Sequence, residues 1–578
     1  MSTSSEEIRA TATKYAALNA AQFDGKAQPG PVIGKLMAEY PELKLRIKEI
    51  MPLIKQSIDV VNSWTHEQQQ AFIEEKYPEL LERRKVEEEK KRLPPLENVD
   101  MWPMVKTRFA PNPDGALHLG SAEPIVFCDE YAKMYDGHFI LRYEDTSAEV
   151  KPPIPEMYDA IVEDLEWLGV RVDEKYLQSE RLEIYYEYTE RLLAMGEAYV
   201  CTCVSEEFRR LYMASEPCPC RELPPDEQIR RWRMMLDGGF RKGEAVVRVK
   251  TDLSHPNPAV RDWPALRISE EPHPLQGTKY RVWPLYNFSC GIDDHLMGVS
   301  HVIRGKEHDV NTIRQQWLQR HFGWRSPEVI NVGRLGLEVG ILSKSKMRRG
   351  IEDGTYSGWD DPRLGTLRSL RRRGLLPETI RAIMIHVGPK PVNVTISWDN
   401  IAAENRKIIE PTADRFFFVK DPVELRVTDI PGEHVARLPL HPDHPERGMR
   451  DYAVSPKDGE FIFMISRDDV DKLRRGGLAR LMGAMNIKPE SVTDALVEAR
   501  YHSHGYQSAR EADAPFIHWL PRGVGAQGRV VMPDASIAQG IVEERCLELN
   551  GDQMIQFERF GFCRVDSPDP FVAYYTHK

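Results

Sequence analysis

The chain has 578 residues, which is too long for one hydrophobic core and predicts several domains. Hydrophobic residues make up 41% and charged residues 29%, as in globular proteins, and no apolar run is long enough to span a bilayer. The net charge of −11 argues against an indiscriminate nucleic-acid binder, but it leaves room for local basic surfaces that contact RNA. The start of the chain lacks the layout of a secretory signal. We therefore expect a cytoplasmic protein with neither a membrane nor DNA as a partner.

The first part of the chain, residues 1–100, is predicted to be a helical N-terminal region. Apolar residues recur at helical spacing through residues 32–37 and 43–54. Residues 79–92 are almost all charged, which is typical of a solvated helix or a hinge. The dipeptide Pro94-Pro95 ends this run, and the composition changes after it.

Residues 101–350 are predicted to form an α/β catalytic domain with a Rossmann-like parallel sheet. Short apolar strands at 139–143 and 299–303 alternate with amphipathic helices such as 157–168. A segment with cysteine pairs and many prolines, 196–283, interrupts this alternation. We interpret that segment as an inserted subdomain.

The remainder of the chain is predicted to be helical at first and then all-β. Residues 351–410 form an expected helical connecting domain, in which the helix at 364–388 carries several arginines. Residues 411–578 contain short β-type runs, for example at 416–419 and 461–465, which predict a barrel-like module.

Near the end of the chain, the sequence predicts a hairpin. Residues 542–549 form the expected first strand, Asn550-Gly551 is a strong turn signal, and residues 554–564 form the expected return strand.

The most informative motif lies at residues 107–121, which read Thr-Arg-Phe-Ala-Pro-Asn-Pro-Asp-Gly-Ala-Leu-His-Leu-Gly-Ser. This pattern predicts a strand, a Pro/Gly-rich turn and a helix that starts near His118. A helix N-terminus offers free N–H groups and a positive dipole end to a phosphate, and His118 can donate to it. Gly120 has no Cβ, so a nucleoside can lie against the backbone. A histidine at a helix start is more often a capping or packing residue, so the pattern alone leaves both interpretations open.

The same motif closely resembles the ATP signature of the class I aminoacyl-tRNA synthetases, in its glutamyl/glutaminyl form. Ser121 stands where the signature usually has histidine, as is common in glutamyl members of archaeal type. The run Ile-Leu-Ser-Lys-Ser-Lys at 341–346 resembles the mobile lysine loop of this class, although Ile341 replaces its first lysine. In isolation it would be a solvated basic turn. The resemblance implies that His118 and Lys344 are catalytic. The implied ATP-binding residues are Pro111, Gly115, His118, Gly120, Ser121, Ser343 and Lys344.

The resemblance also implies a pocket for glutamate. Residues 141–146 end a strand where open α/β sheets bind ligands, and the family match assigns the α-ammonium contact to Glu144. It places Arg108 and Arg304 at the substrate's side-chain carboxylate, which a guanidinium binds bidentately. Glutamine would leave a guanidinium poorly paired, at a cost of roughly 3–5 kcal/mol. A structural ion pair is the alternative for Arg304. The implied glutamate-binding residues are Arg108, Ala110, Asn112, Glu144, Tyr286, Cys290 and Arg304.

Two Cys-x-Cys pairs lie in the predicted insertion. Four thiolates can close a tetrahedral structural zinc site, and disulfides are less expected in a reducing compartment. Free thiols remain the alternative, because Cys-x-Cys is less diagnostic than Cys-x-x-Cys. Some glutamyl synthetases have a comparable cluster. The predicted ligands are Cys201, Cys203, Cys218 and Cys220.

Basic residues cluster after the lysine loop and again in the all-β region. Both clusters can follow RNA phosphates, although each alone is typical of a solvated surface. The first contains Arg363, Arg368, Arg371, Arg372 and Arg373, and the second contains Lys472, Arg474, Arg475 and Arg480.

Later motifs, such as Phe-Ile-His-Trp-Leu at 516–520, resemble the archaeal and eukaryotic glutamyl group and imply a β-barrel anticodon-binding region. The motif match covers about residues 105–578. It implies the ATP-dependent, Mg²⁺-assisted attachment of L-glutamate to tRNA(Glu) through glutamyl-adenylate, and it leaves open whether tRNA(Gln) is also a substrate. A glutaminyl-tRNA synthetase and a non-catalytic RNA-binding relative are the alternatives. A small-molecule nucleotidyltransferase would not need the long β-rich region.

Overall fold

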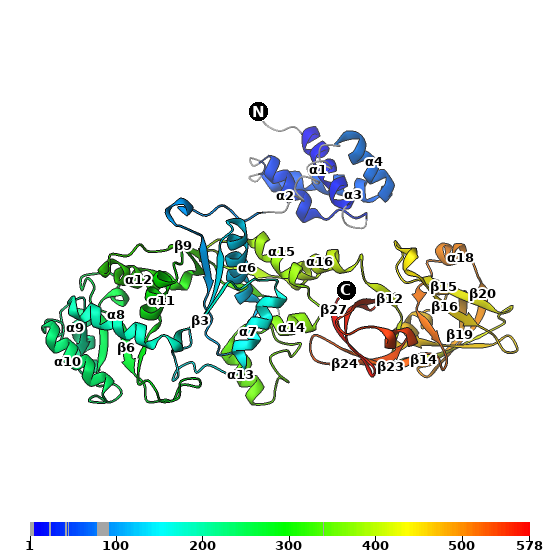
Figure 1. The fold of residues 1–578 in the computed structure, drawn as a ribbon. Coiled ribbons are helices and arrows are strands. Elements are labelled where there is room, and N and C mark those ends of the chain that lie inside the picture. The colour runs from blue at the N-terminus through cyan, green and yellow to red at the C-terminus, as the bar shows by residue number, and fades with distance from the viewer. Residues whose placement is uncertain (1–4, 22–24, 41–42, 44–45, 78–91, 339) are drawn as a thin grey trace. The chain divides into compact units, whose positions relative to one another are not determined.

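The computed structural model describes residues 5–21, 25–40, 43, 46–77, 92–338 and 340–578. It divides into two compact units, Met1–Arg92 and Leu93–Lys578 (Figure 1). In the described residues, no helix combines the length and the apolar character needed to cross a membrane. Most of the predicted charged segment, residues 79–92, lies outside the described residues.

The first unit is helical, as predicted. Its helices are α1 (Ser5–Ala20), α2 (Pro29–Glu39), α3 (Ile47–Asn62) and α4 (His66–Lys76). They enclose a core of aliphatic side chains that includes Ile8, Leu36 and Ile54. Thr65 caps α4, because its side chain accepts a hydrogen bond from the Gln68 N–H.

The second unit begins with the predicted parallel sheet. Its first elements are β1 (Lys106–Phe109), α6 (Leu119–Met134), β2 (His138–Tyr143), α7 (Glu156–Trp167) and β3 (Glu174–Leu177). The three strands pair in parallel in the order β1-β2-β3. A second parallel pair follows later in the chain, with helices on either side of its first strand. Its elements are α11 (Tyr286–Leu296), β8 (His301–Gly305), α12 (Asp309–His321) and β9 (Glu328–Val332).

The two parts of this parallel sheet are joined at β1. The N–H of Ser300, just before β8, donates to the Lys106 carbonyl at 3.0 Å. The carboxyl ends of β1, β2 and β8 carry Arg108, Arg142 and Arg304. Because parallel strands end at a common edge, this is where a doubly wound sheet binds its ligands.

An antiparallel subdomain is inserted between the two parts. Its elements are α8 (Leu182–Ala194), β4 (Ala198–Cys201), α9 (Ser205–Ala214), α10 (Pro225–Leu236), β5 (Val246–Val249), β6 (Pro264–Ile268) and β7 (Val282–Pro284). The strands pair in the order β4-β5-β6-β7, and their core includes the buried indoles of Trp232, Trp263 and Trp283.

Short helices then connect the parallel sheet to the all-β region. The connecting elements are β10 (Leu335–Leu337), α13 (Lys344–Glu352), α14 (Leu367–Arg372), α15 (Pro377–Val387), β11 (Val394–Ile396) and α16 (Trp398–Ile409). The single helix predicted within 364–388 is therefore two helices, which Gly374 separates with a positive φ of 88°.

The last part of the chain contains two seven-stranded sheets. One has the order β12-β25-β26-β27-β23-β24-β13, with β12 (Asp414–Phe416), β13 (Phe418–Lys420), β23 (Ala526–Val531), β24 (Ile537–Val542), β25 (Met554–Phe557), β26 (Gly561–Pro568) and β27 (Phe571–His577). The other has the order β21-β18-β19-β20-β14-β17-β22, with β14 (Pro422–Thr428), β17 (Phe461–Ser466), β18 (Ala479–Leu481), β19 (Asn486–Val492), β20 (Leu496–Ser503), β21 (Phe516–Ile517) and β22 (Trp519–Pro521).

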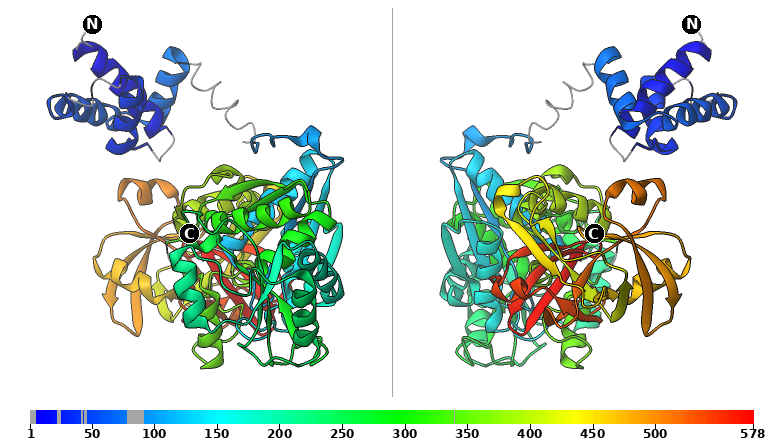
Figure 2. Two further views of the ribbon diagram at one scale, coloured as in Figure 1. Left: turned by 90° about the vertical axis from the view of Figure 1, so that its left-hand side faces the viewer. Right: turned by 90° about the vertical axis from the view of Figure 1, so that its right-hand side faces the viewer.

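In each of these sheets, the first and the last strand of the order are neighbours in the sequence. Phe417 alone separates β12 from β13, and His518 alone separates β21 from β22. The first and last strands of each order therefore lie next to each other, which closes the sheet as a barrel and confirms the predicted barrel region. Figure 2 shows the orange strands of one barrel apart from the red strands of the other. The remaining elements are β15 (His434–Pro439), β16 (Met449–Val454), α17 (Arg467–Arg474) and α18 (Tyr506–Glu511).

The predicted hairpin at Asn550-Gly551 is wrong. Strand β24 ends at Val542, and a 3-10 helix at Glu544–Glu548 follows it. Strand β25 pairs with β12 and β26 and not with β24. The stretch 554–564 is thus two strands around a tight turn, in which Arg559 takes the left-handed conformation with φ 66°.

Candidate active site

A cavity of about 610 Å³ lies at the start of helix α6. His118, Gly120, Ser121 and Ser343 line it, which brings four of the predicted ATP-binding residues together. His118 occupies the N-cap position of α6, as the sequence predicts. A Cβ on Gly120 would lie 3.1 Å from the His118 ring, so a larger residue would crowd that ring.

His118 is neutral at physiological pH. Burial, with help from the Lys344 ammonium, lowers the pKa of its imidazole to about 4. Its Nδ1 is buried and has no hydrogen-bond partner among the described residues. A neutral imidazole at the positive end of a helix can therefore donate a hydrogen bond to a phosphate oxygen.

Lys344 reaches the motif of residues 107–121 from the other side. Its Nζ lies 3.0 Å from Asp114 Oδ1 and 3.3 Å from the Asn112 carbonyl oxygen. The sequence predicts a loop here, and in the structure Ser343 is the N-cap and Lys344 the first residue of helix α13. Asp114, on the turn that precedes His118, thus holds Lys344 close to His118.

Pro111 and Gly115 shape the turn and do not line this cavity. The Pro111 carbonyl accepts a hydrogen bond from the Glu144 N–H at 2.9 Å. Gly115 packs against Trp359, whose ring would lie 2.7 Å from an added Cβ. Ser121 Oγ accepts from the His118 N–H at 3.5 Å, a long contact at the start of the helix.

Buried charges gather at the carboxyl ends of β1 and β2. Asp294 Oδ1 accepts from Arg142 Nη1 at 2.7 Å and from Arg108 Nε at 3.3 Å. Arg142 Nη2 also donates to Glu144 Oε1 at 3.1 Å and lies 3.1 Å from Cys290 Sγ. Burial raises the pKa of Asp294, but the two guanidiniums outweigh it and hold that pKa at about 2. Burial raises the pKa of the Cys290 thiol to about 12, so Cys290 is neutral.

Arg304 differs from the other two arginines. It donates to Tyr286 Oη at 3.3 Å and to Thr312 Oγ1 at 2.7 Å. Its Nε is buried without a partner, and no carboxylate of the described residues lies within ion-pair distance of it. The described ion pairs of these three guanidiniums are with Glu144 and Asp294, whereas the neighbouring buried carboxylate of Asp293 is paired with Arg181.

A second cavity, of about 220 Å³, has Glu144 and Tyr286 in its wall. These are the two residues that Arg142 and Arg304 contact directly. Ala110 follows β1 outside this set of contacts, and Asn112 donates to the Lys151 carbonyl at 3.3 Å. The structure thus brings together Arg108, Glu144, Tyr286, Cys290 and Arg304 from the predicted set.

Sequence reasoning missed Arg142 and Asp294. Arg142 carried a usable signal, because a fully buried arginine in the apolar strand 138–143 requires a buried acidic partner. The identity of that partner had no local signal, since Asp294 lies 152 residues away.

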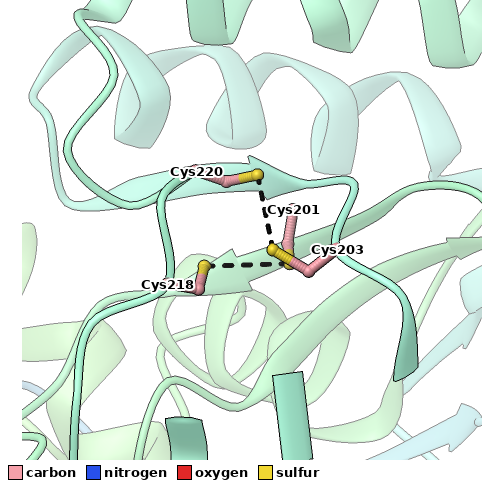
Figure 3. A group of neighbouring side chains, drawn as sticks. All are labelled: Cys201, Cys203, Cys218 and Cys220. Atoms are coloured by element: carbon pink, nitrogen blue, oxygen red, sulfur yellow. Dashed lines mark hydrogen bonds between the residues drawn. The ribbon is translucent and has the colours of Figure 1, made fainter. Parts of the chain in front are cut away.

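The four cysteines of the insertion form a cluster at the end of β4. Figure 3 shows their side chains turned toward one another, and all four sulfur atoms lie within 4.8 Å of each other. Sγ of Cys201 lies 3.9 Å from Cys218, and Sγ of Cys203 lies 3.8 Å from Cys220. These distances exceed a disulfide bond and match the roughly 3.8 Å edge of a tetrahedron with Zn–S bonds of about 2.3 Å.

Many basic residues of the two predicted RNA-contact clusters are engaged within the chain. Arg363 pairs with Asp361 at 2.7 Å, and Arg372 pairs with Asp360 at 2.7 Å. The same holds in the second cluster, where Lys472 pairs with Asp469. These pairs reduce the positive charge that either cluster offers to RNA.

Comparison with known proteins shows the family of the chain. The family model of the catalytic domain of class I tRNA synthetases (E and Q) matches residues 104–411, and two models of the anticodon-binding domain of the same family match residues 413–503 and 516–566. The chain is 50% identical over 580 residues to a glutamate–tRNA ligase of Pyrococcus furiosus, with 99% of this chain and 100% of the relative covered. It is 51% identical over 577 residues to that of Thermococcus kodakarensis, with the same coverage, and 44% identical over 574 residues to that of Methanopyrus kandleri, with 99% of each chain covered. The chain therefore belongs to the class I tRNA synthetases of the E and Q family.

Proposed function

We infer that the chain is a glutamate–tRNA ligase that uses ATP to attach L-glutamate to tRNA(Glu). The observation that carries this inference is the excess of buried positive charge at the edge of the parallel sheet. Arg304 has no acidic partner among the described residues, so the side-chain carboxylate of a bound glutamate can complete the set. The full-length relatives named glutamate–tRNA ligase support the same substrate.

In the first step, an oxygen of the glutamate α-carboxylate attacks the α-phosphorus of ATP, and pyrophosphate leaves. Glu144 accepts from the α-ammonium group, and Arg108 and Arg304 hold the side-chain carboxylate. His118 donates to a phosphate oxygen as negative charge develops there. Lys344 exchanges its contact with Asp114 for the departing pyrophosphate. Mg²⁺ bound to the polyphosphate would supply further charge neutralisation.

In the second step, a hydroxyl of the terminal tRNA ribose attacks the carbonyl carbon of the mixed anhydride, and AMP leaves. We propose that the inserted subdomain, residues 196–283, holds the acceptor stem and that the barrels, residues 411–578, read the anticodon. The relatives' role in protein synthesis makes the cytoplasm the proposed compartment.

We propose that Cys201, Cys203, Cys218 and Cys220 hold a structural Zn²⁺. The donor set fits, because four sulfur atoms at tetrahedral spacing suit this metal and leave no open position for chemistry. The Thr202 N–H lies 3.4 Å from Cys220 Sγ and can stabilise that thiolate.

The test of the proposed function is aminoacylation of purified tRNA(Glu) and tRNA(Gln) with glutamate and with glutamine in separate reactions. We expect glutamate to be charged onto tRNA(Glu), and the tRNA(Gln) reaction decides whether that tRNA is a second substrate. Preferential charging of glutamine would identify a glutaminyl-tRNA synthetase. No charging and no tRNA-dependent ATP–pyrophosphate exchange would identify a non-catalytic relative.

A further inference from the structure

A third cavity, of about 580 Å³, lies between the connecting helices and strand β27. Its wall includes Arg373, Trp398 and Arg406 on the helical side and Tyr575 and Thr576 on β27. None of its lining residues borders the cavity at the start of α6. Its volume falls within the range of about 300–1,000 Å³ that is typical of small-molecule sites.

Arg373 is the unusual residue of this wall. Only 7% of it is exposed, its Nε is buried without a hydrogen-bond partner, and the described residues offer it no ion pair. Its guanidinium lies over the Trp398 ring, 4.1 Å from the centroid. Burial alone lowers the pKa of Arg373 to about 10, whereas its neighbour Arg372 has a carboxylate partner in Asp360. A buried cation without an anion is costly, so this position favours an external anion.

Thr576 supplies a second unused donor. It is 3% exposed, and its Oγ1 is buried without a partner among the described residues. A Cβ on Gly374 would lie 2.6 Å from this hydroxyl oxygen, so only a glycine can pack this closely against it. Arg406 adds an exposed guanidinium. Burial lowers the pKa of His577, and the positive charges of Arg406 and Arg373 lower it further. The part of the wall formed by Arg373, Arg406 and Thr576 is therefore cationic and carries hydrogen-bond donors, and Asp399 adds one carboxylate elsewhere in the wall.

We propose that this cavity binds a nucleotide, with its phosphate held by Arg373, Thr576 and Arg406 and its base or ribose against Trp398 and Tyr575. Two guanidiniums and a hydroxyl match the charge and the several acceptor oxygens of a phosphate better than a single carboxylate. Aromatic side chains beside arginines are a common surface for unpaired bases. The nucleotide comes either from solution, as a mononucleotide, or from bound tRNA. The site does not depend on which amino acid is activated.

The test uses the full chain with a non-hydrolysable glutamyl-adenylate analogue saturating the active site, so that AMP can enter only elsewhere. In calorimetry, a mononucleotide site binds one AMP per chain. We expect Arg373→Met to weaken this binding by about tenfold to a hundredfold, the usual effect of losing a hydrogen-bonded charge. If the nucleotide belongs to tRNA, AMP binds weakly or not at all, and the same variant weakens tRNA affinity by a similar factor.

Thr576→Val is the second variant, because it keeps the shape and loses only a hydroxyl that has no partner in the described part of the chain. We expect it to fold and to weaken the same binding by about fivefold to tenfold. Lys407→Met is the matched control, since Lys407 lies beside Arg406 on α16, pairs with Glu404 and does not line the cavity. The proposal is overturned if AMP and tRNA affinities are the same in the wild type, Thr576→Val and Lys407→Met, whatever the stability of Arg373→Met.

Discussion

Asp294→Asn tests the buried charge cluster most specifically. The carboxylate accepts from Arg142 at 2.7 Å and from Arg108 at 3.3 Å, and it is almost completely buried. Asparagine keeps one acceptor oxygen but removes the charge, so both guanidiniums lose their shared anion. Removal of one partner of a buried ion pair costs about 3–5 kcal/mol. Because the asparagine keeps one acceptor oxygen for the guanidiniums, we expect a loss of stability near the lower end, about 3 kcal/mol.

The same substitution should weaken glutamate binding, because Arg108 and the Arg142–Glu144 pair both depend on Asp294 for their position. We expect the KM for glutamate to rise about 10- to 100-fold, which corresponds to roughly 1.4–2.8 kcal/mol. The KM for ATP should change by less than about twofold, since the cavity at the start of α6, the proposed nucleotide cavity, shares no residue with this cluster. Steady-state aminoacylation with each substrate varied in turn measures both constants.

Asp293→Asn is the control, because the neighbouring carboxylate is equally buried but contacts Gln178, Arg181 and Tyr185. Thermal unfolding should show that both variants lose stability, whereas only Asp294→Asn should lose affinity for glutamate. Equal changes of the glutamate KM in the two variants would show that the effect is general destabilisation, and the reasoning would then be refuted.

Three further predictions concern the nucleotide cavity and the cysteine cluster. Burial and nearby Glu307 raise the pKa of Glu123 to about 7, and both residues line the nucleotide cavity. The folded state thus holds this proton above the ordinary glutamate pKa of 4.5, so the contribution of Glu123 to stability falls as the pH rises from 4.5 to 7. The ionised Glu123 should repel the phosphates of ATP by roughly 1 kcal/mol, so the KM for ATP should rise about threefold to tenfold between about pH 6 and 8. A rise that persists in Glu123→Gln would contradict this. Lys344→Met should lower kcat by about 10²- to 10³-fold with the glutamate KM nearly unchanged, and a purely KM effect in single-turnover assays would refute a role at the transition state. Mass spectrometry under native conditions should find one zinc per chain and none in Cys218→Ser, and chelation should lower the melting temperature; a metal-free wild type of equal stability would exclude the site.

The sequence predicts the local structure of residues 107–121 well because its signals are local. A strand, a Pro/Gly-rich turn and a helix N-terminus follow one another within residues 107–121, and the structure has them in that order. The cysteine pairs are local in the same way, and their sulfur atoms do converge.

The buried charge cluster could not be predicted in full, because it depends on contacts between distant segments. Nothing near Arg142 in the sequence identifies Asp294 as its partner, and only the alignment of β2 with α11 brings them together. The wrong hairpin has a related cause. The apolar residues of the 542–549 run fit either a strand or a helical turn, and tertiary packing of Cys546 in the barrel core decides between them.

The guanidinium of Arg304, which has no acidic partner among the described residues, should select a carboxylate in the proposed amino-acid pocket. The direct measurement is kcat/KM for glutamate and for glutamine in the wild type and in Arg304→Ala, with the same tRNA(Glu). We expect the wild type to prefer glutamate by at least about a hundredfold, from a penalty of roughly 3–5 kcal/mol, and the variant to lose most of that preference by losing glutamate activity. An Arg304→Ala enzyme that still charges glutamate with wild-type efficiency and selectivity would contradict the account.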